Sequence, residues 1–130
     1  MFVANSEERK KYEPLHEALT KAWSWESCSV GAQPHWPGGN PAKGQCFPSA
    51  LVVQDVFGGE LWELPLGGGA IHYYNVIDGS IVDLTAEQFP EAVTEAFYAG
   101  GVPSDREKRL SEPVKREKYE TLSAAVKTRI

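Results

Sequence analysis

The sequence predicts one α+β domain, in which a helix that begins with a cysteine packs on an antiparallel sheet of three or more strands. Its 130 residues allow a single hydrophobic core. Residues 7–23 carry apolar side chains every three or four positions, which is the spacing of an amphipathic helix. Residues 46–57 are apolar almost throughout and stop at two glycines, which indicates a buried helix. Residues 70–77 and 80–84 flank Asp78-Gly79, a dipeptide typical of two-residue hairpin turns.

A helix is predicted at each end of the chain. The first is expected within residues 1–24, and its regular part should begin near Tyr12, because Pro14 is tolerated only in a first turn. The second is expected within residues 104–130, where charges of both signs indicate a solvated helix face and Pro113 suits a first turn. The apolar stripes of these two helices comprise Tyr12, Leu15, Leu19, Ala22 and Trp23, and then Leu110, Val114, Tyr119, Leu122, Val126 and Ile130.

The middle of the chain is divided between a loop, a buried helix and a sheet. Residues 24–45 show no periodicity and are rich in glycine and proline, so we expect a long ordered loop of the kind that often carries function. The run Leu51-Val52-Val53 also suits a buried strand, but Pro48 near the start of its segment and the glycines at its end favour the helix. Residues 60–84 then alternate with a period of two and predict the sheet.

Cys46 is the first candidate for chemistry, because it stands where the glycine-rich loop meets the predicted buried helix. Backbone N–H groups and the positive end of the helix dipole stabilise a thiolate at such a position. The thiolate is the nucleophilic form of cysteine. The alternative is an inert thiol in the core, where cysteine is often found.

The hairpin predicts a partner for this cysteine. With Asp78-Gly79 as the turn, Tyr74 faces Asp83, so His72 and Asp83 lie on one face of the sheet as a diagonal pair. A carboxylate in that place orients the imidazole and favours its protonated form. A three-residue bulged loop would bring Asn75 to that place instead. His72 as a satisfied core residue and Asp83 as a helix cap are the alternatives for the single residues.

The same residues resemble a known group of enzymes. A Gly-x-Cys-aromatic segment that opens a helix, followed by His72 and then Asp83 on strands, is similar to the papain-like and transglutaminase-like cysteine enzymes. A more specific resemblance, across most of residues 20–90, is to the YunG-like family of small bacterial proteins. Its motifs here are Ala22-Trp23-Ser24, Asn40-Pro41, Gly44-Gln45-Cys46, Ala50-Leu51-Val52-Val53-Gln54-Asp55, His72-Tyr73-Tyr74-Asn75 and Asp83-Leu84-Thr85-Ala86-Glu87-Gln88-Phe89.

The resemblance implies a minimal papain-like core and an oxyanion hole. Papain relatives commonly place a glutamine six residues before the nucleophile, and this position is Asn40 here. The backbone N–H of Cys46, together with the side-chain amide of Asn40 or Gln45, is the expected donor pair. Trp36, in the loop before Cys46, is the aromatic side chain expected to contact a substrate.

Composition excludes several classes of partner. The net charge of −5 disfavours nucleic-acid binding, and no apolar run is long enough to cross a membrane. The N-terminus has no hydrophobic segment typical of a signal peptide, and there are only two cysteines, so we expect a cytoplasmic protein. No nucleotide or flavin signature is present, and no cofactor is expected. The separations of Cys28, His35, Cys46 and His72 fit no paired-ligand zinc pattern, so no metal is expected.

The favoured hypothesis is a cysteine-dependent amide hydrolase, deamidase or acyl transferase with a Cys46, His72 and Asp83 triad. Cys46 attacks the acyl carbon, His72 takes and returns the proton, and Asp83 orients His72. The substrate would be a small-molecule, peptide or protein amide. The alternative is a binding or interaction module that keeps the papain-like fold without turnover.

Overall fold

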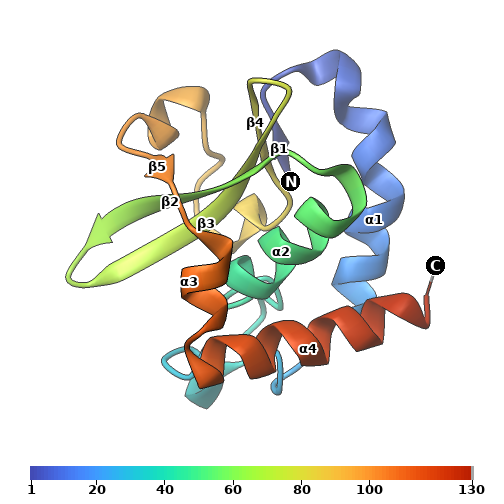
Figure 1. Ribbon diagram of the computed structural model, residues 1–130, viewed down its shortest axis with the longest axis vertical. Coiled ribbons are helices and arrows are strands. Elements are labelled where there is room, and N and C mark those ends of the chain that lie inside the picture. Colours follow the sequence, from blue (N-terminus) through green and yellow to red (C-terminus); the bar gives the residue numbers. More distant parts are fainter. Residues whose placement is uncertain (130) are drawn as a thin grey trace.

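The computed structural model describes residues 1–129 and confirms the α+β class with an antiparallel sheet (Figure 1). The strands are β1 (Phe2–Val3), β2 (Glu60–Gly67), β3 (Ala70–Ile77), β4 (Ser80–Asp83) and β5 (Val102–Pro103). The α-helices are α1 (Arg9–Ala22), α2 (Cys46–Phe57), α3 (Arg106–Leu110) and α4 (Pro113–Lys127). Short 3₁₀ helices span Ser6–Glu8, Gln33–His35, Ala86–Gln88 and Glu95–Tyr98.

The sheet has five strands in the order β1-β4-β3-β2-β5, and all its neighbours are antiparallel. The β3–β4 hairpin has the register expected for a two-residue turn, with Ile77 opposite Ser80 and Val76 opposite Ile81. Asp78 and Gly79 both have positive φ, 51° and 78°, as a type I′ turn requires. This turn sets which side chains of β4 share a face with those of β3.

Helix α2 lies between the sheet and α4 and forms the centre of the core (Figure 1). Its residues Phe47, Ala50 and Leu51 pack on Leu61 of β2 and Tyr73 of β3. Val52 and Val53 of α2 belong to a second cluster, which includes residues of α1 and α4. Full burial of each such side chain stabilises the fold by roughly 1.5–3 kcal/mol relative to exposure. The position of α2 is therefore fixed by its packing on both sides.

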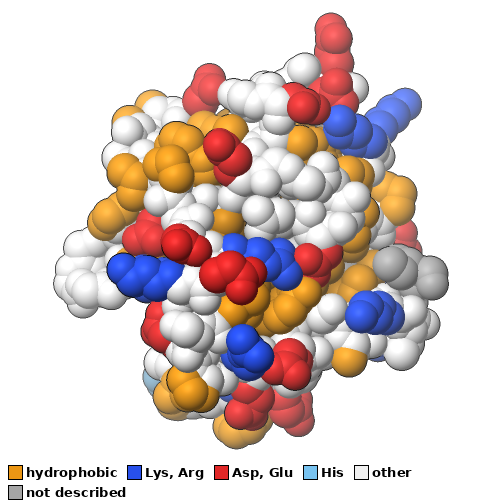
Figure 2. Space-filling view, in the orientation of Figure 1, with side chains coloured by type: hydrophobic (Ala, Val, Ile, Leu, Met, Phe, Trp, Pro, Cys, Tyr) orange, Lys and Arg blue, Asp and Glu red, His pale blue; other side chains and the backbone are white. Residues whose placement is uncertain are grey.

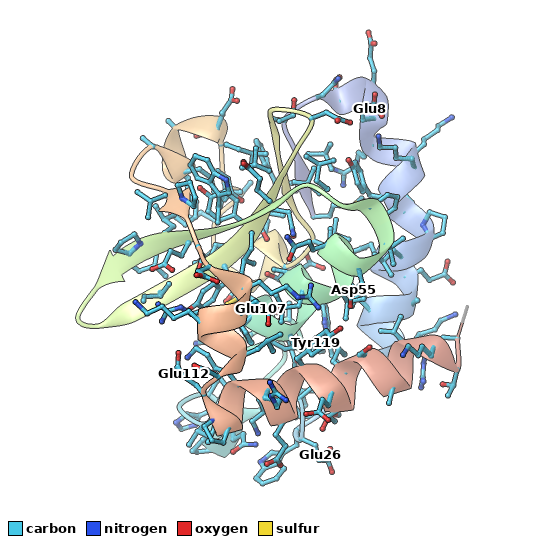
Figure 3. The ribbon with its side chains drawn as sticks, in the orientation of Figure 1. Glu8, Glu26, Asp55, Glu107, Glu112 and Tyr119 are labelled. Atoms are coloured by element: carbon cyan, nitrogen blue, oxygen red, sulfur yellow. The ribbon has the colours of Figure 1, made fainter. Side chains whose placement is uncertain are left out.

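Helix α3 is joined to α2 and α4 by polar contacts around Arg106. Its guanidinium lies 2.8 Å from the Asp55 carboxylate and donates to the Tyr119 hydroxyl. Figure 3 shows Asp55 and Tyr119 side by side between α2 and α4. The Tyr119 hydroxyl in turn donates to Asp55. The C-terminal part of the chain is therefore held against α2, the helix that begins with Cys46.

The two terminal helices differ from their expected bounds. Helix α1 begins at Arg9 rather than near Tyr12, and Pro14 lies inside it. The preceding 3₁₀ turn, which Asn5 caps, already winds the chain, so Pro14 removes one backbone hydrogen bond without ending the helix. The predicted helix over 104–130 is two helices, because Pro113 begins α4 as a new helix. Ile130, the last residue of the predicted stripe, lies outside the described residues.

Strands β1 and β5 have no counterpart in the sequence-based expectation. Each has two residues, which is too short for an alternation of apolar and polar side chains to be seen. They pair with β4 and β2 and complete the edges of the sheet. None of the helices among residues 1–129 combines the length and the apolar character that a membrane span requires.

Candidate active site

Cys46 is the first residue of α2 and is half-buried. The N–H groups of its first turn have no partner within the helix, as in any α-helix, and no side chain caps them here. Gly44 brings the loop to this point with a φ of +81°, and a Cβ there would lie 2.6 Å from the Cys28 Sγ atom. The approach of the loop to the helix therefore requires glycine at position 44.

The Gln45 amide holds the loop against the start of α2. Its Oε1 accepts a hydrogen bond from Ser27 Oγ at 2.7 Å, and its Nε2 donates to the Ser24 carbonyl at 2.9 Å. The side chain is fully buried. Gln45 was expected to be a candidate oxyanion donor, but its amide is engaged with the loop instead.

Asn40 and Trp36 are also engaged elsewhere. The Asn40 amide donates both of its protons, to the carbonyls of Glu87 and Gln88 at 3.1 and 3.2 Å. The Trp36 indole donates to the Pro41 carbonyl and lines a cavity of about 290 Å³ to which Cys46 does not contribute. In this structure these hydrogen bonds hold the loop 29–45 in place, and the oxyanion and substrate roles of Asn40 and Trp36 stay predictions.

His72 and Asp83 are brought together as the hairpin register predicts. Nε2 of His72 lies 2.6 Å from Oδ2 of Asp83, and both side chains are 1% exposed. Because a carboxylate only accepts hydrogen bonds, Nε2 carries the proton in this pair. Nδ1 is then the ring nitrogen left to exchange a proton with a neighbouring group.

Asp83 is held by three further hydrogen bonds that the sequence did not reveal. The backbone N–H and the hydroxyl of Thr85 donate to Oδ1 at 3.1 and 3.3 Å. The Tyr98 hydroxyl donates to Oδ2 at 2.6 Å. Burial, followed by the nearby Asp83 charge, raises the pKa of Tyr98, so its hydroxyl remains a donor. The carboxylate is thus fixed in position by its donors.

Gln88 is a second residue that the sequence did not assign to the site. Its Nε2 donates to Thr85 Oγ1 and lies 3.3 Å from Nδ1 of His72. The His72 ring also contacts the edge of Phe89, with ring centroids 4.9 Å apart. A Thr85 to Gln88 spacing is a capping-box signal in the sequence, but nothing in that signal points to the imidazole.

The electrostatics of His72 favour the imidazolium form. Burial lowers its pKa, but the hydrogen bonds to Asp83 and to Cys46 act in the opposite direction. Their sum raises the pKa of His72 from 6.5 to about 10. Asp83 and Cys46 are thus the neighbouring side chains that favour the protonated form of His72.

Cys46 also opens onto a cavity of about 320 Å³. Its walls come from the loop 24–45, the first residues of α2, the β2–β3 turn at Gly69, strand β3 and α4. The second cysteine, Cys28, is fully buried, and burial raises the pKa of its thiol. Of the two thiols, Cys46 is the one placed to meet a ligand. Within residues 1–129 no three His, Cys, Asp or Glu side chains gather as metal ligands would.

Comparison with known proteins shows the family. A family model described as "YunG protein" matches residues 11–130 of the chain. The chain belongs to the YunG family. The "Uncharacterized protein YunG" of Bacillus subtilis (strain 168) is 36% identical over 107 residues, which cover 82% of this chain and 84% of that relative. No solved structure matches the chain. The resemblance predicted from the motifs of residues 20–90 is thus confirmed at the level of the YunG family.

Proposed function

We propose that the protein is a cysteine-dependent amide hydrolase, deamidase or acyl transferase with a papain-like arrangement of Cys46, His72 and Asp83. The observation that carries the proposal is the buried His72 imidazole, whose Nε2 lies 2.6 Å from Asp83, with Cys46 and Asp83 lining one small pocket and Cys46 among the groups that raise the pKa of His72. Structural His–Asp pairs need no thiol beside them, and an inert core cysteine needs no cavity. Here Cys46 lies beside the His72–Asp83 pair and also lines a cavity.

The chemistry follows from these contacts. Sγ of Cys46 attacks as the thiolate beside the protonated His72 ring and forms a bond to the carbonyl carbon of the amide, while the electron pair of the C=O bond moves to the oxygen. The tetrahedral intermediate breaks its C–N bond, and the leaving nitrogen takes the proton from His72. The product is an acyl-thioester, which water or a second amine attacks while the now neutral His72 accepts its proton. The C–S bond then breaks, which restores the Cys46 thiolate and the protonated His72. Asp83 keeps Nδ1 directed at the reacting atoms and stabilises the imidazolium.

The oxyanion is assigned to backbone donors. The first-turn N–H groups of α2, at Cys46 and Phe47, have no partner in the helix and lie at its positive end. Pro48 has no N–H, so the donors are confined to these two residues. Backbone donors are assigned in place of the Asn40 and Gln45 side chains, because both side-chain amides already donate to other carbonyls.

The test is the alkylation of Cys46 by iodoacetamide, followed by mass spectrometry of the intact and digested protein. We expect Cys46 to be labelled much faster than Cys28, and His72→Gln to slow that labelling at neutral pH. The buried Cys28 is an internal control for unfolding, because a loosened protein would label it too. A covalent acyl adduct with a reactive amide or ester should form in the wild type and be absent from Cys46→Ala.

The same test separates an enzyme from a binding module. The full engagement of the Asn40 amide is the observation that favours a module without turnover, because it removes one expected oxyanion donor. Such a module predicts slow alkylation of Cys46 that does not change in His72→Gln. That result would overturn the proposed function.

A further inference from the structure

The cavity beside Cys46 is basic and apolar. Its apolar side chains include Phe47 of α2, Ile71 and Tyr73 of β3, and Val114 of α4. Its charged side chains are Lys115 and Lys118 of α4, and no Asp or Glu side chain is among the described residues that line it. The chain as a whole carries a net charge of −5. On the face of the molecule in Figure 2, by contrast, Lys and Arg side chains lie among acidic ones.

Lys118 is a buried ammonium without a carboxylate partner. It is 9% exposed, and its Nζ donates to the backbone carbonyl of Glu26 at 2.9 Å. Within residues 1–129 no carboxylate lies in ion-pair distance of it. Figure 3 shows Glu26 in the loop beneath α4, with its side chain away from the helix.

An ammonium has three donors, so Lys118 keeps N–H groups for a ligand. Burial of a charge without a counter-ion is costly, and an anion in the cavity would offset that cost.

Lys115 lies one helical turn closer to the start of α4. Its Nζ is 5.8 Å from the centre of the Phe47 ring, the residue that follows Cys46. Its only ion pair among the described residues is with Glu112 at 3.7 Å, a weak pair between partly exposed side chains of one helix. Lys115 can therefore turn to a ligand at little cost. The two lysines place positive charge on the α4 side of the cavity.

We propose that this cavity selects amides that carry a carboxylate next to an apolar group. The carboxylate would lie between Lys115 and Lys118, and the apolar group against Phe47 and Tyr73. The volume of about 320 Å³ is at the small end for ligand sites, which suits a short substrate rather than a folded protein segment. This inference rests on the proposed function, because it assigns the substrate class of the same cysteine.

The test compares two reagents of nearly equal size that differ in charge, iodoacetate and iodoacetamide. The ratio of their alkylation rates at Cys46 is independent of how much thiolate is present, because both reagents meet the same thiol. In Lys115→Gln, and further in the double variant with Lys118→Gln, we expect this ratio to fall by about three- to tenfold. The loss should shrink as salt is added. Lys21→Gln, at an exposed site of α1, is the control and should leave the ratio unchanged.

A second measurement uses a ligand. N-acetyl-phenylalanine should protect Cys46 from iodoacetamide, and N-acetyl-phenylalaninamide, which lacks the carboxylate, should protect it far less. Equal protection by both, or a rate ratio that is the same in the wild type and in Lys115→Gln, would overturn the substrate class. Lys115→Gln keeps the test valid if the buried Lys118 is needed for folding. An unchanged ratio together with slower labelling in His72→Gln would leave the proposed function standing, so the two failures are distinguishable.

Discussion

The hydroxyl of Tyr98 and the imidazole of His72 share one oxygen of Asp83, and each lies 2.6 Å from Oδ2. Tyr98 comes from the 3₁₀ helix after the last long strand, 15 residues beyond Asp83. It acts on the imidazole through the carboxylate, and is therefore a positioning residue. Tyr98 is thus a fourth, buried side chain, joined to the proposed triad through Asp83.

Removal of this hydroxyl is the first prediction. Tyr98→Phe should lower the free energy of unfolding by about 1.5–3 kcal/mol, because one buried hydrogen bond to a charged group is lost. It should also raise the pKa of His72, because the charge on Oδ2 is then shared with one donor fewer. Urea unfolding and an NMR titration of the imidazole measure the two effects. An unchanged His72 titration would restrict Tyr98 to a packing role.

The charge of Asp83 is the second target. In Asp83→Asn the imidazole keeps its burial but loses its counter-ion, so the pKa of His72 should fall and Cys46 alkylation at neutral pH should slow. Removal of one partner from a buried pair is expected to cost roughly 3–5 kcal/mol of stability. Asp78→Asn, in the turn of the same hairpin, is the matched control. Asparagine tolerates its positive φ, so stability should change by less than about 0.5 kcal/mol there.

The raised pKa of His72 makes the stability of the fold depend on pH. The folded protein holds this proton more tightly than the unfolded chain, so the proton stabilises the fold fully below about 6.5. That contribution is lost as the pH rises from 6.5 towards about 10. Unfolding experiments across this range should show the difference in stability between the wild type and His72→Gln shrinking as pH increases. A constant difference would mean that His72 is neutral in the folded protein.

Gly44 is the last target, since it sets the approach of the loop to Cys46. Gly44→Ala should destabilise the protein by about 2–4 kcal/mol, from the positive φ together with overlap with Cys28 and Ala32. Gly39→Ala has nearly the same φ but nothing within 4 Å of the new Cβ, so it should cost only about 1 kcal/mol. Equal losses in the two variants would show that the close approach at position 44 is not rigid.

The His72–Asp83 pair is the part of the site that could be predicted from the sequence. The Asp78-Gly79 turn sets the hairpin register, and the register decides which side chains share a face. The start of α2 at Cys46 is equally local, since Pro48 and the glycines on each side limit the helix. The surroundings of the pair could not be predicted in this way. Tyr98 and Gln88 reach it from irregular segments whose path depends on the packing of the whole chain.

The amides of Asn40 and Gln45 illustrate the same limit. Both residue types are suitable donors, and both occupy positions near the cysteine in the sequence. Which acceptor each one meets depends on where the loop 24–45 and the segment after β4 lie in space. A buried amide takes the partner that satisfies it there, and sequence distance does not reveal that partner.

The amino-acid sequence alone therefore determined the class of the fold, the helix headed by Cys46 and the pairing of His72 with Asp83, because short-range turn geometry and periodicity specify each of these. Only the tertiary structure decided what surrounds the thiol. It brings α4, from the far end of the chain, to the cavity and places Lys115 and Lys118 in its wall. Contacts between segments so distant in sequence arise from the packing of complementary surfaces, and no local pattern encodes them.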